Sequence, residues 1–138
     1  MSVPADQSWE SFEEYLRALE GLELGHNIAT LVGHNAVRTA VLGPDERAPD
    51  EGELEQMRAL VDEAMLAGAY GLSTGLVYPP GCFAGTDEIV ELAKVAARHG
   101  GMYASHIRGE RETILDAISE AIEIGRRSGA RVQISHNC

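Results

Sequence analysis

The chain has 138 residues, of which 44% are hydrophobic and 24% are charged, as in an ordinary soluble globular domain. Its formal net charge of -11 repels nucleic-acid phosphates and anionic lipid, so neither is expected as a partner. The sequence also lacks a run of about 18 apolar residues, so we expect no membrane-spanning helix.

Cellular location is predicted from the beginning of the chain and from its cysteines. Residues 1–6 have neither the basic end nor the apolar stretch of a secretory signal. The two cysteines, Cys82 and Cys138, form no disulfide framework that would indicate an oxidising compartment. Together these features predict a cytoplasmic protein.

The first half of the chain contains two predicted helices. Apolar residues recur every three or four positions over 8–20, which predicts the first helix. Two short apolar runs follow, at 27–33 and 38–42. Asp50 and Glu53 have the spacing of a capping box, and they predict a second helix that begins there and ends at Gly68.

The second half alternates strands with helices. We expect strands at 69–74, 102–106 and 131–136, and helices at 86–99 and 110–127. Thr86 is the expected cap of its helix, with Asp87 and Glu88 at the positive end of the helix dipole. The loop over 75–85 contains two prolines and should be irregular. The last helix is expected to turn these residues inward: Ile114, Ile118, Ala121 and Ile122.

Strands that alternate with helices are typical of an α/β protein with a parallel sheet and crossover helices. The last two predicted strands begin at Met102 and Arg131, which fits the roughly 30 residues that each unit of a (β/α)8 TIM-type barrel needs. An open doubly wound sheet would have a similar spacing. Because few strands are expected and the sequence stops just after one, we expect 1–138 to be a partial barrel domain of about three to four βα units, a fragment of a longer chain. A self-associating half-barrel is the alternative.

Two predicted strands end in the same dipeptide, Ser105-His106 and Ser135-His136. Because side chains alternate along a strand, each histidine should share a face with the residues two and four positions before it. Those residues are small or apolar, as suits a barrel interior: Met102, Ala104, Val132 and Ile134. We therefore expect both histidines to point inward at the carboxyl ends of neighbouring strands, where barrel enzymes build their active sites.

Two imidazoles in this arrangement could bind one metal ion. Neighbouring strands lie about 4.8 Å apart, and zinc binds an imidazole nitrogen at about 2.0–2.1 Å. A single histidine at a strand end is more often a hydrogen-bonding or core residue, so the prediction rests on the pair. A catalytic zinc normally has about three protein ligands, so the others would come from outside this chain or from residues that the pattern does not identify.

The sequence resembles one known family along most of its length. GAYGLSTGLVYPPG at 68–81 is similar to the "GAxGLSTGLxYxPG" segment of the D-aminoacylases, the N-acyl-D-amino-acid deacylases. Further similar segments lie in the family's order and at its spacing, at 31–34 with Arg38, 86–88, 103–110 and 134–136. The resemblance extends from about Asn27 to His136, and the combination of motifs is more specific than any one of them.

This resemblance implies an amidohydrolase-type (β/α)8 barrel with a small β-sandwich, in which His106 and His136 bind Zn2+. It also implies that the family's paired His-x-His, its bridging cysteine and its acid/base aspartate lie outside this chain. No catalytic acid/base residue is therefore assigned within it. Where the family continues with His-Lys after the last Ser-His, this chain has Asn137-Cys138, a departure that can mark a subfamily.

The activity implied by the resemblance is zinc-dependent hydrolysis of a small molecule, an N-acyl-D-amino acid, to a carboxylate and a D-amino acid. The runner-up enzyme is a cyclic amidase of the dihydropyrimidinase or dihydroorotase type, and the alternative from another class is a non-catalytic α/β binding module without metal affinity. The Gly-Leu-Ser-Thr-Gly-Leu stretch favours the first activity. The 138-residue chain alone is expected to be inactive, and its oligomeric state is not predicted.

Three residues are candidates for substrate binding. Arg108 could bind a substrate carboxylate in a bidentate manner. It could equally pair with Glu110 or another carboxylate to shape its loop, and this second interpretation is favoured. Ser73 and Tyr78 flank the exit from a strand and are weaker candidates, because polar residues are common in such loops. Two further residues, His34 and Cys82, are expected to be structural and inert.

Overall fold

The computed structural model describes residues 8–136, which form a parallel sheet with helices between its strands. The strands are β1 (Val32–Gly33), β2 (Gly71–Gly75), β3 (Met102–His106) and β4 (Arg131–Ile134). The helices are α1 (Phe12–Glu20), α2 (His34–Leu42), α3 (Glu51–Ala67), α4 (Thr86–Arg98) and α5 (Ile114–Ser128), with short 3-10 turns at Gly81–Phe83 and Arg111–Thr113. Neighbouring strands pair in chain order and all are parallel, so the predicted α/β class is confirmed.

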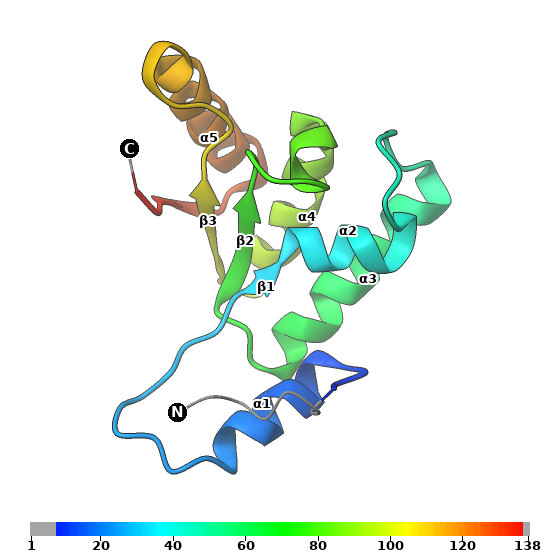
Figure 1. Ribbon diagram of the computed structural model, residues 1–138, viewed down its shortest axis with the longest axis vertical. Coiled ribbons are helices and arrows are strands. Elements are labelled where there is room, and N and C mark those ends of the chain that lie inside the picture. The colour runs from blue at the N-terminus through cyan, green and yellow to red at the C-terminus, as the bar shows by residue number, and fades with distance from the viewer. Residues whose placement is uncertain (1–7, 137–138) are drawn as a thin grey trace.

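The chain runs back across the sheet through helices, so that successive strands point the same way. Figure 1 shows the ends of β2 and β3 on one side of the molecule, whereas α1 and the loop after it lie at the opposite end. Gly75 at the end of β2 pairs with His106 at the end of β3. Within residues 8–136, the four strands form an open sheet, and no helix is both long and apolar enough to cross a membrane.

Helix α3 begins and ends where the sequence predicts. Asp50 Oδ1 accepts a hydrogen bond from the Glu53 backbone N–H at 2.8 Å, and the Glu53 carboxylate accepts one from the Asp50 N–H at 2.8 Å. This capping box satisfies donors that the first turn leaves unpaired. Hydrogen bonds from Arg47 also lower the pKa of Glu53 to about 2. At the other end, Gly68 adopts a left-handed conformation with φ of 116°.

Several boundaries differ from the prediction. The apolar run at 38–42 is not a separate segment but part of α2, which begins immediately after β1. Helix α4 has Gly85 as its N-cap instead of Thr86, whose hydroxyl donates to Glu120 on α5. The first helix begins at Phe12, with Ser11 as its cap, and β4 ends at Ile134, two residues before the predicted end.

The prediction that Ile122 faces inward on α5 is wrong. Its side chain is 60% exposed, whereas Ala121 is buried. The buried positions on this helix are Ala117, Ala121, Ile124 and Gly125. This stripe follows the helical repeat of about 3.6 residues and is centred beside Ala121 and Gly125, which turns Ile122 to the outside.

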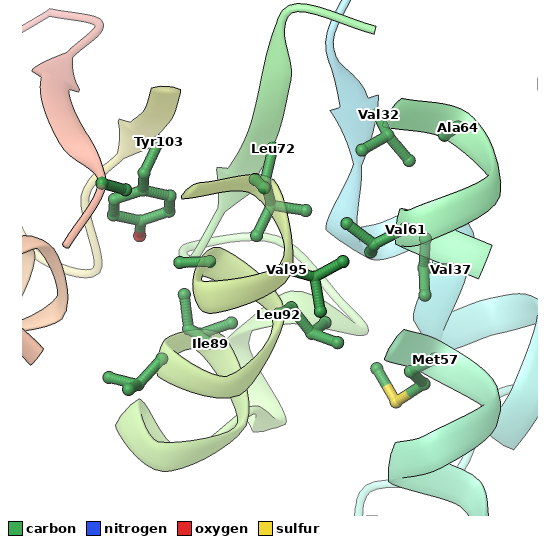
Figure 2. Close-up of a cluster of buried hydrophobic side chains, with 14 of the residues drawn as sticks. Val32, Val37, Met57, Val61, Ala64, Leu72, Ile89, Leu92, Val95 and Tyr103 are labelled. Atoms are coloured by element: carbon green, nitrogen blue, oxygen red, sulfur yellow. The ribbon is translucent and has the colours of Figure 1, made fainter. Parts of the chain in front are cut away.

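The hydrophobic core lies between the sheet and the helices. Figure 2 shows Leu72 on β2 and Tyr103 on β3 pointing toward α4, where Ile89 and Leu92 meet them. All four side chains are fully buried. The Tyr103 hydroxyl hydrogen-bonds with Thr74 Oγ1 at 3.0 Å, and burial raises the pKa of Tyr103. Because Tyr103 faces the helices, its strand neighbour Ala104 and then His106 face the other side of the sheet.

Gly71 at the start of β2 should tolerate no side chain. Its φ is 154°, and an added Cβ would lie 2.1 Å from the Met102 carbonyl oxygen. We expect Gly71→Ala to lower the free energy of unfolding by about 3 kcal/mol or more, because backbone strain and a clash with a neighbouring strand add together. Urea unfolding of the chain measures this loss.

Gly129→Ala is the matched control, since Gly129 also has a positive φ, 78°, but faces open space. Gly129→Ala should lower the free energy of unfolding by about 1 kcal/mol, through backbone strain alone. Equal losses at the two positions would contradict the account.

Candidate metal centre

Two histidines from neighbouring strands meet at the carboxyl edge of the sheet. His106 is the last residue of β3, and His136 lies two residues beyond the end of β4. His106 Nδ1 and His136 Nε2 are 2.8 Å apart, and the ring centroids are 4.3 Å apart with the planes at 74°. The Ser135 N–H donates to the Ser105 carbonyl at 2.9 Å, which continues the ladder up to the pair. The two strand-end histidines of the sequence are therefore brought together.

The nitrogens of this pair suit a divalent cation. Imidazole is a common metal ligand, and two ring nitrogens this close can bind one ion once the proton shared between them is displaced. The other ring nitrogen, His106 Nε2, is buried and has no hydrogen-bond partner among residues 8–136; Glu110 Oε1 is 3.8 Å away. Within the same residues, no three His, Cys, Asp or Glu side chains gather to hold a metal ion. The described residues thus bring two imidazoles together as candidate ligands.

The structure corrects how His136 reaches this position. Val132 pairs with Tyr103 in the sheet, and both Val132 and Ile134 pack on the helix side. The prediction that these two residues face a barrel interior is therefore wrong. His136 nevertheless meets His106 because β4 ends at Ile134, so the alternation of a regular strand does not extend to it.

Tyr78 lies beside the histidine pair, whereas Ser73 lies deeper in the sheet. The Tyr78 ring centroid is 5.2 Å from that of His106, with the planes at 47°, and the side chain is 57% exposed. The Leu76 N–H donates to the His106 carbonyl at 3.0 Å, which fixes the start of this loop. Ser73 is within β2, pairs with Ala104, and its hydroxyl is 3.4 Å from the Val32 carbonyl.

Arg108 is engaged by other parts of the chain. Its Nε donates to Glu120 Oε2 at 2.9 Å, and its two terminal nitrogens donate to the Cys82 carbonyl at 3.1 Å and the Ala84 carbonyl at 2.8 Å. The hydrogen bond to Glu120 raises the pKa of the guanidinium, against the opposite effect of burial. These contacts support the loop-shaping interpretation. The partner is Glu120 on α5, and Glu110 instead lies near His106.

A buried ionic cluster between α2 and α4 was missed by sequence reasoning. His34, at the start of α2, and Arg38 are fully buried and contact the buried Glu88 carboxylate on α4. His34 Nε2 is 2.7 Å from Glu88 Oε1, and Arg38 donates to Glu88 Oε2 at 2.6 Å. Burial alone would raise the pKa of Glu88, but the hydrogen bonds from His34 and Arg38 outweigh it and leave the pKa below its ordinary value. Glu88 thus ties α4 to α2, beyond its expected role at the helix dipole.

The residues of this cluster lie in segments that the sequence analysis singled out, but nothing in the sequence indicated that they contact one another. The segment with His34 and Arg38 and the segment with Glu88 are two of those that carry the resemblance described above. Residues about 50 positions apart have no spacing rule that pairs them. The structural role expected for His34 agrees with its contact to Glu88.

Comparison with known proteins shows which class of protein the fold resembles. No protein-family model matches the chain. A solved D-aminoacylase that defines a novel subset of amidohydrolases matches 92% of this chain with a TM-score of 0.87 and 43% identity. The N-acyl-D-glutamate deacylase of Bordetella bronchiseptica, solved with zinc and a phosphonate mimic of the tetrahedral intermediate, matches 92% with a TM-score of 0.87 and 38% identity. The chain is thus similar in fold and sequence to amidohydrolases.

Sequence comparison narrows this class. D-aminoacylase of Alcaligenes xylosoxydans xylosoxydans is 43% identical over 129 residues, which is 94% of this chain and 27% of that protein. N-acyl-D-aspartate deacylase of the same organism is 44% identical over 128 residues, covering 92% of this chain and 26% of that protein. Along nearly its whole described length, the chain is therefore a homologue of one part of the D-aminoacylases and N-acyl-D-amino-acid deacylases. It spans about a quarter of the length of these relatives, 27% and 26%.

Proposed function

We propose that this chain is the part of a metal-dependent N-acyl-D-amino-acid amidohydrolase that supplies two zinc ligands, His106 and His136. The observation that carries the proposal is the 2.8 Å approach of two imidazole nitrogens at the ends of neighbouring parallel strands. Zinc in the similar N-acyl-D-glutamate deacylase supports the choice of metal. The names of the relatives support an N-acyl amino acid as the small-molecule substrate. They give no support to a cyclic amidase.

The proposed reaction is the addition of water to the amide carbonyl of an N-acyl-D-amino acid, followed by release of a carboxylate and a D-amino acid. A bound zinc ion lowers the pKa of its water to about 7 and polarises the carbonyl. His106 and His136 would hold the ion through ring nitrogens and take no part in proton transfer. The Tyr78 ring lies beside His106, with the ring centroids 5.2 Å apart. The acid/base carboxylate is expected from a part of the protein outside this chain.

We further propose that the sheet continues into a (β/α)8 barrel. Within residues 8–136, β4 pairs with β3 and with no strand on its other side. On the helix that precedes it, Leu115 is 75% exposed and Ile122 is 60% exposed. Exposed apolar side chains beside an open strand edge favour a neighbouring βα unit. The cytoplasmic location stays a prediction.

The proposed function is tested with the complete protein that carries this segment. We expect it to hydrolyse N-acetyl-D-methionine and not the L-enantiomer. Activity should fall at least about a hundredfold after removal of metal by a chelator and return with zinc, because the ion supplies both the activated water and the polarised carbonyl. The readout is released amino acid.

Two outcomes would contradict the proposal. One is hydrolysis of dihydrouracil in place of the N-acyl amino acids, which would favour the cyclic amidase. The other is a metal-free, inert protein, which would favour the binding module. The 138-residue chain alone serves as the negative control, since it offers two of the ligands and no assigned acid/base.

A further inference from the structure

The loop between β2 and α4, residues 76–85, forms one wall of the candidate metal centre. It carries Tyr78, whose ring lies 5.2 Å from that of His106. Because Tyr78 is 57% exposed, burial does little to hold its ring in place. The position of this ring therefore depends on how the loop backbone is held.

Arg108 holds the far half of this loop. Its terminal nitrogens donate to the carbonyls of Cys82 and Ala84, at 3.1 and 2.8 Å. The other edge of the guanidinium donates to the Glu120 carboxylate on α5, at 2.9 Å from Nε. A planar guanidinium has donors on three separate nitrogens and can bridge three separated acceptors in this way, whereas an ammonium group has all its donors on one nitrogen.

Glu120 completes the attachment. Its Oε1 also accepts a hydrogen bond from Thr86 Oγ1 at 2.8 Å, at the first residue of α4. The carboxylate is 14% exposed, so its bonds are shielded from water and screened less than those of a surface pair. The end of the loop, the start of α4 and the middle of α5 are thus joined through a single Arg108–Glu120 pair.

The near half of the loop is also fixed. The Cys82 N–H donates to the Tyr78 carbonyl at 3.0 Å. Cys82, whose carbonyl accepts a hydrogen bond from Arg108, is therefore also hydrogen-bonded to Tyr78. At Gly81, an added Cβ would lie 2.3 Å from Asn35 Oδ1, which shows how closely the turn packs on α2. A displacement at Cys82 is therefore transmitted to Tyr78 through one hydrogen bond and a closely packed turn.

We propose that Arg108 is a positioning residue, which holds the loop over 76–85 and thereby keeps the Tyr78 ring beside His106, and that it does not bind the substrate carboxylate. This inference rests on the proposed function for its catalytic consequence but not for its structural one. It replaces a direct role in substrate binding with an indirect one, and the two roles predict different behaviour of Glu120 and Tyr78 variants.

The structural consequence is tested on the 138-residue chain by amide hydrogen exchange and by nuclear Overhauser contacts between the Tyr78 and His106 rings. In Arg108→Met, which keeps the aliphatic stem, exchange over 76–85 should accelerate by about tenfold or more and the ring contact should be lost. Glu120→Gln should change both in the same direction. Asp87→Asn is the control, since it breaks another ion pair between α4 and α5, that with Arg127, at an exposed position. Unchanged exchange in Arg108→Met would overturn the proposal.

The catalytic consequence is tested in the complete protein. Arg108→Met should lower kcat by roughly ten- to a hundredfold through misplacement of the site, with the zinc content unchanged. Glu120→Gln should lower kcat as well. The double variant Arg108→Met, Tyr78→Ala should have the same kcat as Arg108→Met alone. Arg108→Lys should fail to restore activity, because its single nitrogen cannot reach all three acceptors.

A different pattern would overturn the proposal. A substrate-binding arginine predicts a raised KM with kcat unchanged, normal activity in Glu120→Gln, additive effects with Tyr78→Ala, and recovery in Arg108→Lys. If the complete wild-type protein hydrolyses no N-acyl-D-amino acid, the proposed function fails, while hydrogen exchange and the ring contact in the 138-residue chain still decide whether Arg108 holds the loop.

Discussion

Replacing Glu88 by glutamine should lower the free energy of unfolding by about 3–5 kcal/mol, because it leaves a buried arginine without its counter-charge. Arg38 is 0% exposed and donates to Glu88 at 2.6 Å, and the carboxylate itself is 4% exposed. Glutamine has nearly the same shape, so the loss would arise from charge and hydrogen bonding and not from a cavity. His34 would lose the same carboxylate partner at 2.7 Å.

Urea unfolding of the 138-residue chain measures this loss, and Glu91→Gln is the matched control. Glu91 lies on the same helix and pairs with Arg58 and Lys94, but its side chain is 30% exposed. Partly solvated pairs of this kind contribute about 1 kcal/mol or less. Equal, small losses in the two variants would show that the buried cluster is not an important contribution to stability.

We expect the Glu88 carboxylate to account for part of the dependence of the free energy of unfolding on pH. Hydrogen bonds from His34 and Arg38 hold the folded-state pKa of Glu88 below its ordinary value of 4.5. A lowered pKa means that Glu88 contributes full stability above its unfolded-state pKa and loses it as the pH falls through the folded-state pKa. Glu88→Gln should therefore lose less stability on acidification below 4.5 than the wild type does. A wild-type and a variant curve that fall in parallel would contradict this assignment.

Replacing His106 by alanine should lower the zinc affinity of the complete protein by on the order of a hundredfold or more, since even residues that merely orient a metal ligand change affinity by about 10- to 100-fold. Deacylase activity should fall with the metal content. His106 contributes a nitrogen 2.8 Å from that of His136, so His136→Ala should behave in the same way.

His99→Ala is the control for these two variants. His99 also contacts another element, through Asp62 on α3 at 2.8 Å, but it lies just before β3 begins, at the opposite end of the strands from His106. Its loss should leave zinc content and activity unchanged. Full zinc occupancy in His106→Ala and His136→Ala would mean that both histidines are structural.

Local signals in the sequence predicted much of the fold. The Asp50–Glu53 capping box and Gly68 define α3, because capping depends on residues within one turn of the helix end. The strand over 102–106 was predicted with its observed limits, and the two Ser-His dipeptides indicated which strand ends meet. The helix ends and the strand limits are set by neighbours in sequence, and the meeting of the two histidines follows because consecutive parallel strands usually lie side by side.

Features that depend on distant partners could not be predicted. Packing on α5 determines which side chains of β4 face the helices, and Val132 and Ile134 are among them. The alternation rule, counted back from His136, had assigned both residues to the other side of the sheet. Arg108 was expected to pair with Glu110 or another carboxylate, and only the structure identifies that carboxylate as Glu120 on α5. The contact of Glu88 with Arg38 joins two helices that no local pattern connects.

Whether His106 and His136 hold the catalytic metal is tested most directly by anomalous diffraction at the zinc edge from crystals of the complete protein. We expect an anomalous peak within about 2.0–2.1 Å of one ring nitrogen of each histidine. A zinc peak at other residues, with His106 Nδ1 and His136 Nε2 still hydrogen-bonded to each other at 2.8 Å, would contradict it.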